Sequence, residues 1–137
     1  ELADGWLARQ ASDGGLSLTP PALPGKAIFH GHCHQKALVG VKGSVSALRL
    51  VRGLEVTALD AGCCGMAGAF GYEADHYDLS VAVANLELVP AVRANPEAVV
   101  VATGTSCRHQ IRDLTGRVAL HPLEVLAGEA RPRSLAD

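Results

Sequence analysis

Aromatic residues and net charge are both scarce in this sequence. Phe, Trp and Tyr make up 4% of its 137 residues, and the formal net charge is −2 with the basic residues scattered along the chain. Such a chain offers no basic surface for nucleic acid. Its apolar positions are filled mainly by Ala, Val, Leu and Gly, a mixture that favours closely packed α/β layers over an aromatic-rich binding surface.

Long apolar runs and targeting signals are also missing. No run approaches the roughly 20 residues that a membrane span requires. Residues 1–10 carry Asp4 and no basic segment, so they do not have the pattern of a signal peptide. Because the chain begins without an initiator Met, we expect a piece of a longer cytoplasmic protein, either free or held peripherally at a membrane by a partner.

Cysteine is scarce as well, with four residues in the chain. A chain of 137 residues that is 48% hydrophobic and 19% charged can bury a sufficient core without disulfides. In the absence of an export signal, such cysteines are more typical of ligands or redox groups than of structural cross-links. Their position in the fold therefore carries the functional argument.

Predicted strands and helices alternate along the chain. Short apolar runs predict strands at 26–30, 54–59, 98–102 and 118–120. Amphipathic patterns predict helices at 1–11, at 45–51 with Ser44 as N-cap, at 73–94 with an interruption near Pro90, from 107 to 114, and at 123–127 after Pro122. The strands are apolar throughout, which is typical of a parallel sheet covered on both faces.

We therefore predict an α/β fold: a small three-layer domain with a roughly four-stranded parallel sheet, helices on both faces and the cysteines at its carboxyl edge. The β-branched strand at 98–102 is the expected central strand. Residues 1–25 are predicted to be a helix and linker from a preceding domain, residues 26–128 the cysteine-rich domain, and residues 129–137 a tail.

Each cysteine follows a predicted strand. Cys33 comes after the first strand, Cys63 and Cys64 after the second, and Cys107 after the third. In a parallel sheet with right-handed crossovers, the carboxyl ends of all strands meet at one edge. We therefore expect the four thiols to converge in one crevice, against the alternative that they are buried structural thiols.

Four thiols in one crevice can hold an iron–sulfur cluster or a zinc ion. The adjacent Cys63 and Cys64 are poorly placed to bond to each other, so they favour a shared ligand. Gly62 and Gly65 would let backbone N–H groups reach the sulfurs. The spacing lacks the C-x-x-C pairs of ferredoxins and zinc ribbons, which leaves a cluster, zinc and a thiol–disulfide site all open.

Positive charge is expected around the thiols. Cys64 and Cys107 fall near the starts of predicted helices, where the helix dipole lowers a thiol pKa. Lys36 and Arg108 lie close in sequence to Cys33 and Cys107 and would add cationic charge.

The histidines give a weaker signal. In an extended segment, His30, His32 and His34 would share one face. His32 and His34 flank Cys33, so they are better metal-site candidates than His30, although simple hydrogen bonding explains them as well. For His121 we favour the start of a helix over a place in the crevice, and we expect His76 at the surface.

Three motifs carry a family resemblance. Residues 32–38 (HCHQKAL), 63–68 (CCGMAG) and 106–110 (SCRHQ) resemble the cysteine-rich CCG domain, which occurs in the B subunit of heterodisulfide reductase, in glycolate-oxidase iron–sulfur subunits, and in anaerobic glycerol-3-phosphate and lactate-utilisation proteins. The strongest similarity is to the C-terminal end of FAD-linked oxidases fused to iron–sulfur modules, of the D-lactate or D-2-hydroxyglutarate dehydrogenase type. The resemblance extends from about Lys26 to Leu126.

The resemblance implies an electron-transfer domain of a multi-domain FAD-linked 2-hydroxyacid dehydrogenase or oxidase. An iron–sulfur cluster, of the 4Fe-4S type, would be held by Cys33, Cys63, Cys64 and Cys107. Lys36, Arg108 and His34 would tune its charge, and Gly62 and Gly65 would line it. FAD would lie on another domain, and the partners would be flavin-binding and ferredoxin-like domains and an electron acceptor.

One position departs from the family pattern. Gln110 stands where a fifth cysteine is expected, which puts a five-thiolate double cluster in question. No hydride-transferring group is visible, so we assign no catalytic residue and do not expect the isolated chain to oxidise a hydroxy acid. The alternatives are a zinc-stabilised docking module and a thiol–disulfide redox site.

Overall fold

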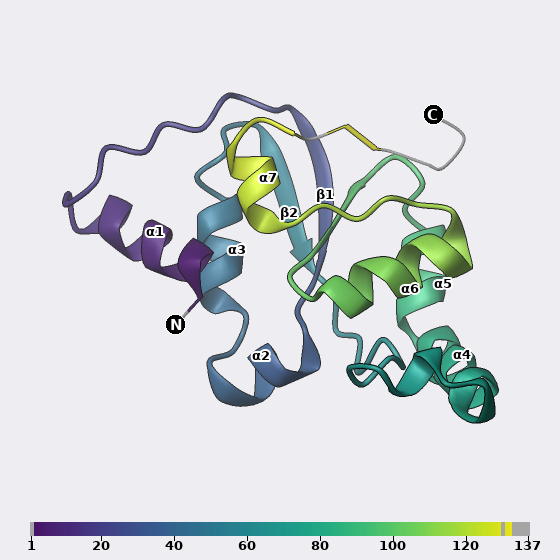
Figure 1. Ribbon diagram of the computed structural model, residues 1–137. Helices are drawn as coiled ribbons and strands as arrows, with labels where there is room; N and C mark the ends of the chain where they lie inside the picture. Colours follow the sequence, from purple (N-terminus) through teal and green to yellow (C-terminus); the bar gives the residue numbers. More distant parts are fainter. Residues whose placement is uncertain (1, 130, 133–137) are drawn as a thin grey trace.

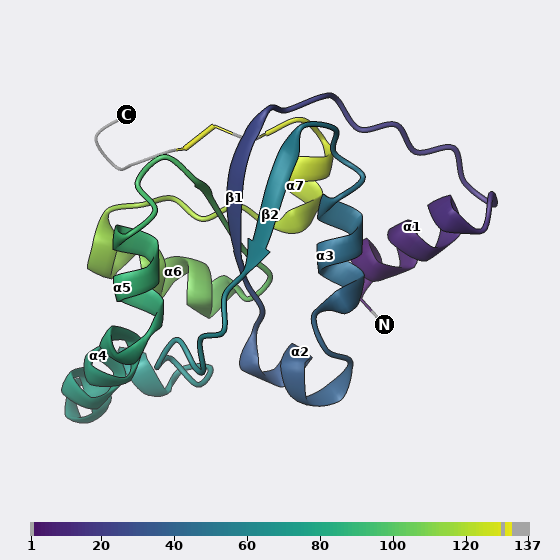
Figure 2. The ribbon, with the colours of Figure 1, turned by 180° about the vertical axis from the view of Figure 1, so that it is seen from behind.

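The computed structural model describes residues 2–129, 131 and 132. They form a parallel sheet between two groups of helices (Figures 1 and 2). The sheet has three strands in the order β2-β1-β3, namely β1 (Gly25–His30), β2 (Leu54–Ala58) and β3 (Val99–Ala102). The predicted α/β class, with a parallel sheet and helices on both faces, is confirmed.

The predicted strand at 118–120 is reduced to one bridge beside β3. Val101 and Leu120 pair in parallel. The Leu120 N–H donates to the Val100 carbonyl at 2.8 Å, and the Ala102 N–H donates to the Leu120 carbonyl at 2.9 Å. The sheet therefore has three strands rather than four, and β1, not β3, is the middle strand in the order β2-β1-β3.

Helices cover both faces of the sheet and its carboxyl edge (Figures 1 and 2). One face carries α1 (Ala3–Ser12), α3 (Lys42–Leu48) and α7 (Pro122–Leu126). The other carries α5 (Leu88–Arg93) and α6 (Thr105–Thr115), with α4 (Tyr77–Leu86) beside α5. The short helix α2 (Cys33–Leu38) lies where the strands end.

Strand alternation divides the core in two. Phe29 and Val101 point to the first face, where they pack with aliphatic side chains of α3 and α7. Ile28 and Val100 point to the second face, where the core also contains Met66 and two of the cysteines. Sulfur therefore enters only one of these two buried clusters.

The predicted helix start at Ser44 is wrong. Helix α3 begins at Lys42, and Ser44 is buried inside it, where its hydroxyl accepts a hydrogen bond from Gln35 Nε2 at 2.8 Å instead of capping the helix. The helical segment predicted at 73–94, with an interruption near Pro90, is found as a 3-10 turn (Ala74–His76), α4 and α5. The interruption falls at Glu87 because the ring of Pro90 is incompatible with a continuous helix through the preceding turn.

Residues 1–25 were predicted to be a helix and linker from a preceding domain. The structure has helix α1 and the irregular segment 13–24 there, and α1 packs against α3 in the core of this domain. Pro122 opens α7, and the His121 ring and Glu124 carboxylate form a capping box there. Most of the predicted tail lies outside the described residues. Within them, no helix combines the length and apolar character needed to cross a membrane.

Candidate functional site

The carboxyl edge of the sheet brings the cysteines together. Cys33 is the first residue of α2, and Cys107 lies in the first turn of α6. Cys63 and Cys64 lie in the loop that follows β2. The prediction that Cys64 lies near a helix start is wrong, because this loop continues through a 3-10 turn (Phe70–Tyr72) before the next helices.

The thiols form a chain of contacts from the surface to the core. All four are free. Cys33 shares a side-chain hydrogen bond with Cys63, Cys63 with Cys64, and Cys64 with Cys107. Cys33 is exposed, whereas Cys64 and Cys107 are only 2% and 0% exposed. One end of the group can therefore meet another molecule while the other end is sealed in the core.

The buried pair is polarised. The Cys107 thiol donates to the Cys64 sulfur, which lowers the pKa of Cys64 to about 6 even though burial acts in the opposite direction. The same hydrogen bond, together with burial, raises the pKa of Cys107. The pair therefore favours the thiolate on Cys64, and the thiolate is the form of cysteine that binds metals.

Gly65 shapes the loop around the adjacent cysteines. Burial raises the pKa of Cys63, and the Gly65 N–H opposes this shift by donating to the Cys63 sulfur at 3.3 Å. The backbone of Gly65 has a φ of +89°, and a Cβ there would overlap the Ser80 carbonyl oxygen. Glycine is therefore needed both for the conformation and for the close approach.

Gly62 and Lys36 hold the same loop rather than the sulfurs. The Gly62 N–H donates to Glu87 Oε2 at 2.7 Å. The Lys36 ammonium donates to the carbonyls of Ala61 and Gly62, the latter at 3.0 Å. Lys36 thus joins α2 to the loop that carries the adjacent cysteines. Glu87 was missed by sequence reasoning, and no sequence signal marks it.

Arg108 and His34 are turned to other partners. The Arg108 guanidinium donates to the carbonyls of Ala102 and Thr103 at 3.2 and 3.1 Å, which closes the turn between β3 and α6. His34 is exposed, its N–H donates to His32 Nδ1 at 3.2 Å, and the two rings stack. For these two side chains, the contacts are with the backbone and with a neighbouring ring rather than with the thiols.

The remaining histidines separate into distinct roles. His32 caps α2, and its ring lies against Gly104, where a Cβ would also come within 2.9 Å of the Cys107 sulfur. His121 caps α7, as predicted, and His76 is partly exposed and stacks on Phe70.

His30 is wholly buried and both of its ring nitrogens have no hydrogen-bond partner within the described residues. Burial, with help from the nearby charges of Lys36 and His32, lowers its pKa to about 4. Because β1 ends at His30, the extended segment in which His30, His32 and His34 would share one face does not form. That His32 and His34, which flank Cys33, are the better metal-site candidates stays a prediction.

Gln110, at the position of the expected fifth cysteine, has a structural contact. Its Nε2 donates to the Ser80 hydroxyl at 3.0 Å and lies 3.4 Å from the Ser80 carbonyl oxygen. The Ser80 hydroxyl in turn lies 3.8 Å from the Met66 sulfur. Gln110 therefore supports the cysteine loop from behind, through Ser80, a residue that sequence reasoning did not single out.

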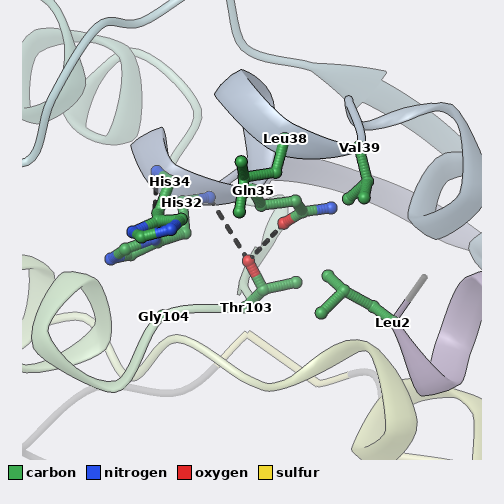
Figure 3. A pocket seen from close by; sticks show the side chains of 8 residues that line it. All are labelled: Leu2, His32, His34, Gln35, Leu38, Val39, Thr103 and Gly104. Atoms are coloured by element: carbon green, nitrogen blue, oxygen red, sulfur yellow. Dashed lines mark hydrogen bonds between the residues drawn. The ribbon is translucent and has the colours of Figure 1, made fainter.

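A pocket of about 440 Å³ opens beside α2 (Figure 3). Across its floor the His32 N–H donates to the Thr103 hydroxyl at 3.3 Å, and that hydroxyl donates to Gln35 Oε1 at 2.7 Å. A second pocket, of about 390 Å³, is lined partly by Cys33 and Leu38. The exposed thiol therefore borders a recessed surface.

The donor set is compatible with an iron–sulfur cluster. Within residues 2–129, 131 and 132, no three His, Cys, Asp or Glu side chains gather closely enough to hold one metal ion. A structural zinc ion needs four such donors around one centre. A cluster distributes its thiolate ligands over several iron atoms. Four neighbouring thiols, one of them with a lowered pKa, together with an unpartnered imidazole, match that chemistry.

Curated relatives of this chain are dehydrogenase proteins. The C subunit of anaerobic glycerol-3-phosphate dehydrogenase from Escherichia coli K12 is 34% identical over 127 residues, which cover 93% of this chain and 32% of that protein. The D-2-hydroxyglutarate dehydrogenase of the same organism is 34% identical over 128 residues, which cover 91% of this chain and 12% of that protein. The D-2-hydroxyglutarate dehydrogenase of Pseudomonas putida is 35% identical over 107 residues, which cover 77% of this chain and 10% of that protein.

No family model and no solved structure matches the chain. The chain spans a third or less of the length of these relatives, so the likeness concerns one segment of each. The resemblance that the three cysteine motifs indicated is confirmed. This chain is therefore similar to one segment of the C subunit of anaerobic glycerol-3-phosphate dehydrogenase and to one segment of D-2-hydroxyglutarate dehydrogenase.

Proposed function

We propose that the chain binds an iron–sulfur cluster and passes electrons within a multi-domain FAD-linked 2-hydroxyacid dehydrogenase or oxidase. The observation that carries this proposal is the continuous line of thiol contacts at one edge of the sheet, formed by Cys33, Cys63, Cys64 and Cys107. When bound, the cluster supplies one-electron chemistry of the 4Fe-4S type. The relatives are dehydrogenases, and an electron-transfer segment is a part that both of them can use.

The chain's own residues prepare the site. Cys64 offers a thiolate at neutral pH because Cys107 donates to it. Gly65 donates to the Cys63 sulfur, and hydrogen bonds of this kind stabilise thiolates bound to metals. Lys36 anchors the loop to α2. Each of these contacts is made within the chain, so the chain's own residues arrange the site.

The exposure of the thiols indicates where electrons would enter and leave the site. Cys33 is the exposed end of the thiol group and borders the second pocket, so an acceptor docks most closely there. Cys107 is sealed in the core. Electrons from a flavin on another domain, relayed by ferredoxin-like centres, would enter and leave through the Cys33 end.

Anaerobic reconstitution with iron and sulfide tests the proposal. We expect broad visible absorption, an EPR signal after reduction, and equal amounts of iron and sulfide bound to the chain. Cys63→Ser and Cys64→Ser should each abolish uptake. As a matched control, Ser46→Cys adds a thiol to an exposed position of α3 and should leave uptake unchanged.

A colourless protein that holds one tight zinc ion and does not respond to iron and sulfide would contradict the proposal. It would favour the zinc-stabilised docking module instead.

Thiol–disulfide exchange is the second candidate, because the exposed Cys33 is hydrogen-bonded to Cys63. In that reaction Cys63 attacks a disulfide substrate, forming a mixed disulfide and releasing one thiol; Cys33 then displaces the second thiol and a Cys33–Cys63 disulfide remains. Incubation of the cluster-free chain with oxidised glutathione, followed by peptide mass analysis, tests this. A Cys33–Cys63 disulfide formed at a rate no faster than in unfolded chain would exclude the exchange function.

A further inference from the structure

His30 is an unexplained polar side chain in the core. It is the last residue of β1 and is 0% exposed, and neither ring nitrogen has a hydrogen-bond partner within the described part of the chain. Buried polar groups in folded proteins nearly always have a partner, because an unmet donor or acceptor is costly in a medium without water. The His30 imidazole therefore lacks the hydrogen-bond partner that a buried polar group normally has.

The strand directs His30 toward the cysteine face. Alternate residues of β1 point to opposite faces, and Ile28, two residues earlier, packs in the core that contains Cys64 and Cys107. In the pairing of β1 with β3, His30 lies opposite Ala102, another member of that core. The ring therefore lies at the carboxyl end of the strands, on the side of the sheet where the buried thiols are.

Other polar side chains around the thiols already have hydrogen-bond partners. Gln110 donates to Ser80, and Arg108 donates to the strand-end carbonyls. His32 Nδ1 accepts from the His34 backbone. His30 is neutral at neutral pH, and a neutral imidazole carries one ring N–H donor. The ring N–H of His30 is therefore available to donate a hydrogen bond.

We propose that His30 donates a ring N–H hydrogen bond to a sulfur atom of the iron–sulfur cluster, which supplies the partner that the imidazole lacks in the cluster-free chain. This inference rests on the proposed function. His30 then acts as a positioning and tuning residue, since hydrogen bonds to cluster sulfurs raise the reduction potential by stabilising the more negative reduced form.

Three variants test the inference in the reconstituted chain. His30→Leu removes the donor and keeps an apolar side chain, whereas His30→Gln keeps an N–H donor. His76→Leu, at a partly exposed histidine that stacks on Phe70, is the matched control. The readout is the midpoint potential, followed by EPR during a redox titration.

In His30→Leu we expect the ratio of reduced to oxidised cluster, at the wild-type midpoint, to fall about tenfold, which equals about 59 mV for one electron. The midpoint potential of His30→Gln should lie closer to that of the wild type, and the midpoint potential of His76→Leu should equal it. Cluster uptake lost in His30→Leu but kept in His30→Gln would also support the donor role.

Thermal unfolding gives a second readout that does not depend on activity. The cluster-free His30→Leu chain should unfold at a temperature no lower than the wild type, because it no longer buries an unpartnered imidazole. After loading, the cluster should raise the unfolding temperature of His30→Leu by less than it raises that of the wild type.

A loaded His30→Leu chain with the wild-type potential would overturn this inference alone. So would uptake lost in both His30 variants while His76→Leu loads normally, or a cluster-free His30→Leu chain that unfolds at a lower temperature. A wild-type chain that takes up no iron and sulfide would overturn the proposed function and, with it, this inference.

Discussion

The two faces of the sheet are packed in contrasting ways. On the face covered by α1, α3 and α7, the buried cluster is hydrocarbon, built around Phe29, Leu48 and Val101. On the face covered by α5 and α6, the corresponding cluster includes Cys64 and Cys107 together with aliphatic residues. We call these the hydrocarbon face and the sulfur face.

The difference separates stability from binding. A hydrocarbon core gains its free energy from burial alone, whatever ligands are present. Both faces bury polar side chains, Asp4 and Ser44 in the helices of the hydrocarbon face and His30, Ser80 and Gln110 on the sulfur face. The buried thiols are therefore what distinguishes the sulfur face. Binding of a metal or cluster to such a face is coupled to folding, because ligands that are costly when bare become satisfied when bound. The following predictions test this contrast.

The largest effect is expected on the hydrocarbon face. Leu48 is 0% exposed, and Leu48→Ala should lower the free energy of unfolding by about 2–5 kcal/mol, through lost burial and the cavity left behind. Leu38→Ala, at a side chain that is 71% exposed, is the control and should change it by less than about 0.5 kcal/mol. Urea unfolding measures both. Equal losses for the two variants would show that the face is not a packed core.

The next effect is the acid sensitivity of the sulfur face. The pKa of His30 is about 4 in the folded chain and 6.5 as the reference value for the unfolded chain. Its contribution to stability is therefore complete above pH 6.5 and is lost as the pH falls toward 4, because only the unfolded chain binds the proton. The loss should be about 3 kcal/mol.

Urea unfolding of the cluster-free chain at pH 7 and pH 4 measures this loss. In His30→Leu the loss between the two pH values should be smaller by that amount. An identical loss in His30→Leu would remove His30 as its source.

A smaller effect is expected from the glycines of the cysteine loop. Gly65 and Gly68 both have positive φ, at +89° and +72°, but a Cβ would meet the Ser80 carbonyl only at Gly65 and has open space at Gly68. Both Ala variants share the backbone strain. Gly65→Ala should therefore lower the free energy of unfolding by about 1–3 kcal/mol more than Gly68→Ala does, as for overpacking in a core. Thermal or urea unfolding of the two variants decides; equal costs would mean that Ser80 moves aside freely.

The smallest effect is expected at Gln110. Gln110→Ala removes the hydrogen bonds to Ser80, and it should lower the free energy of unfolding by about 1 kcal/mol, the usual net worth of such a contact. Asn85→Ala, which removes an exposed bond to the Val81 carbonyl, is the matched control and should have less effect. A larger iron content in Gln110→Ala than in the wild type would contradict the supporting role of Gln110.

The sequence allowed the arrangement of the sheet and the gathering of the cysteines to be predicted, because both depend on chain topology. Parallel strands place their carboxyl ends at one edge, so Cys33, Cys63 and Cys107 had to approach one another. The count of strands failed at 118–120, where one residue, Leu120, falls in register with Val101. A short segment gives the same apolar signal whether it forms a ladder or a single bridge.

The partners of polar side chains could not be predicted from the sequence. Whether Arg108 faces the thiols or the strand-end carbonyls depends on the rotation of α6, which packing decides. The link from Gln110 to Ser80 joins two helices that are distant in sequence. His30 was passed over because its neighbours flank a cysteine more closely, although the strand face, rather than sequence proximity, determines where its ring lies.

One comparison tests the central claim that binding belongs to the sulfur face. Iron and sulfide bound per chain should be measured after anaerobic reconstitution of the wild type, Cys107→Ser and Leu48→Ala, at a temperature where all three are folded. We predict that Cys107→Ser binds neither, although its cluster-free form stays folded, and that Leu48→Ala binds as much as the wild type despite its lower stability. Equal iron contents in Cys107→Ser and the wild type would contradict the account.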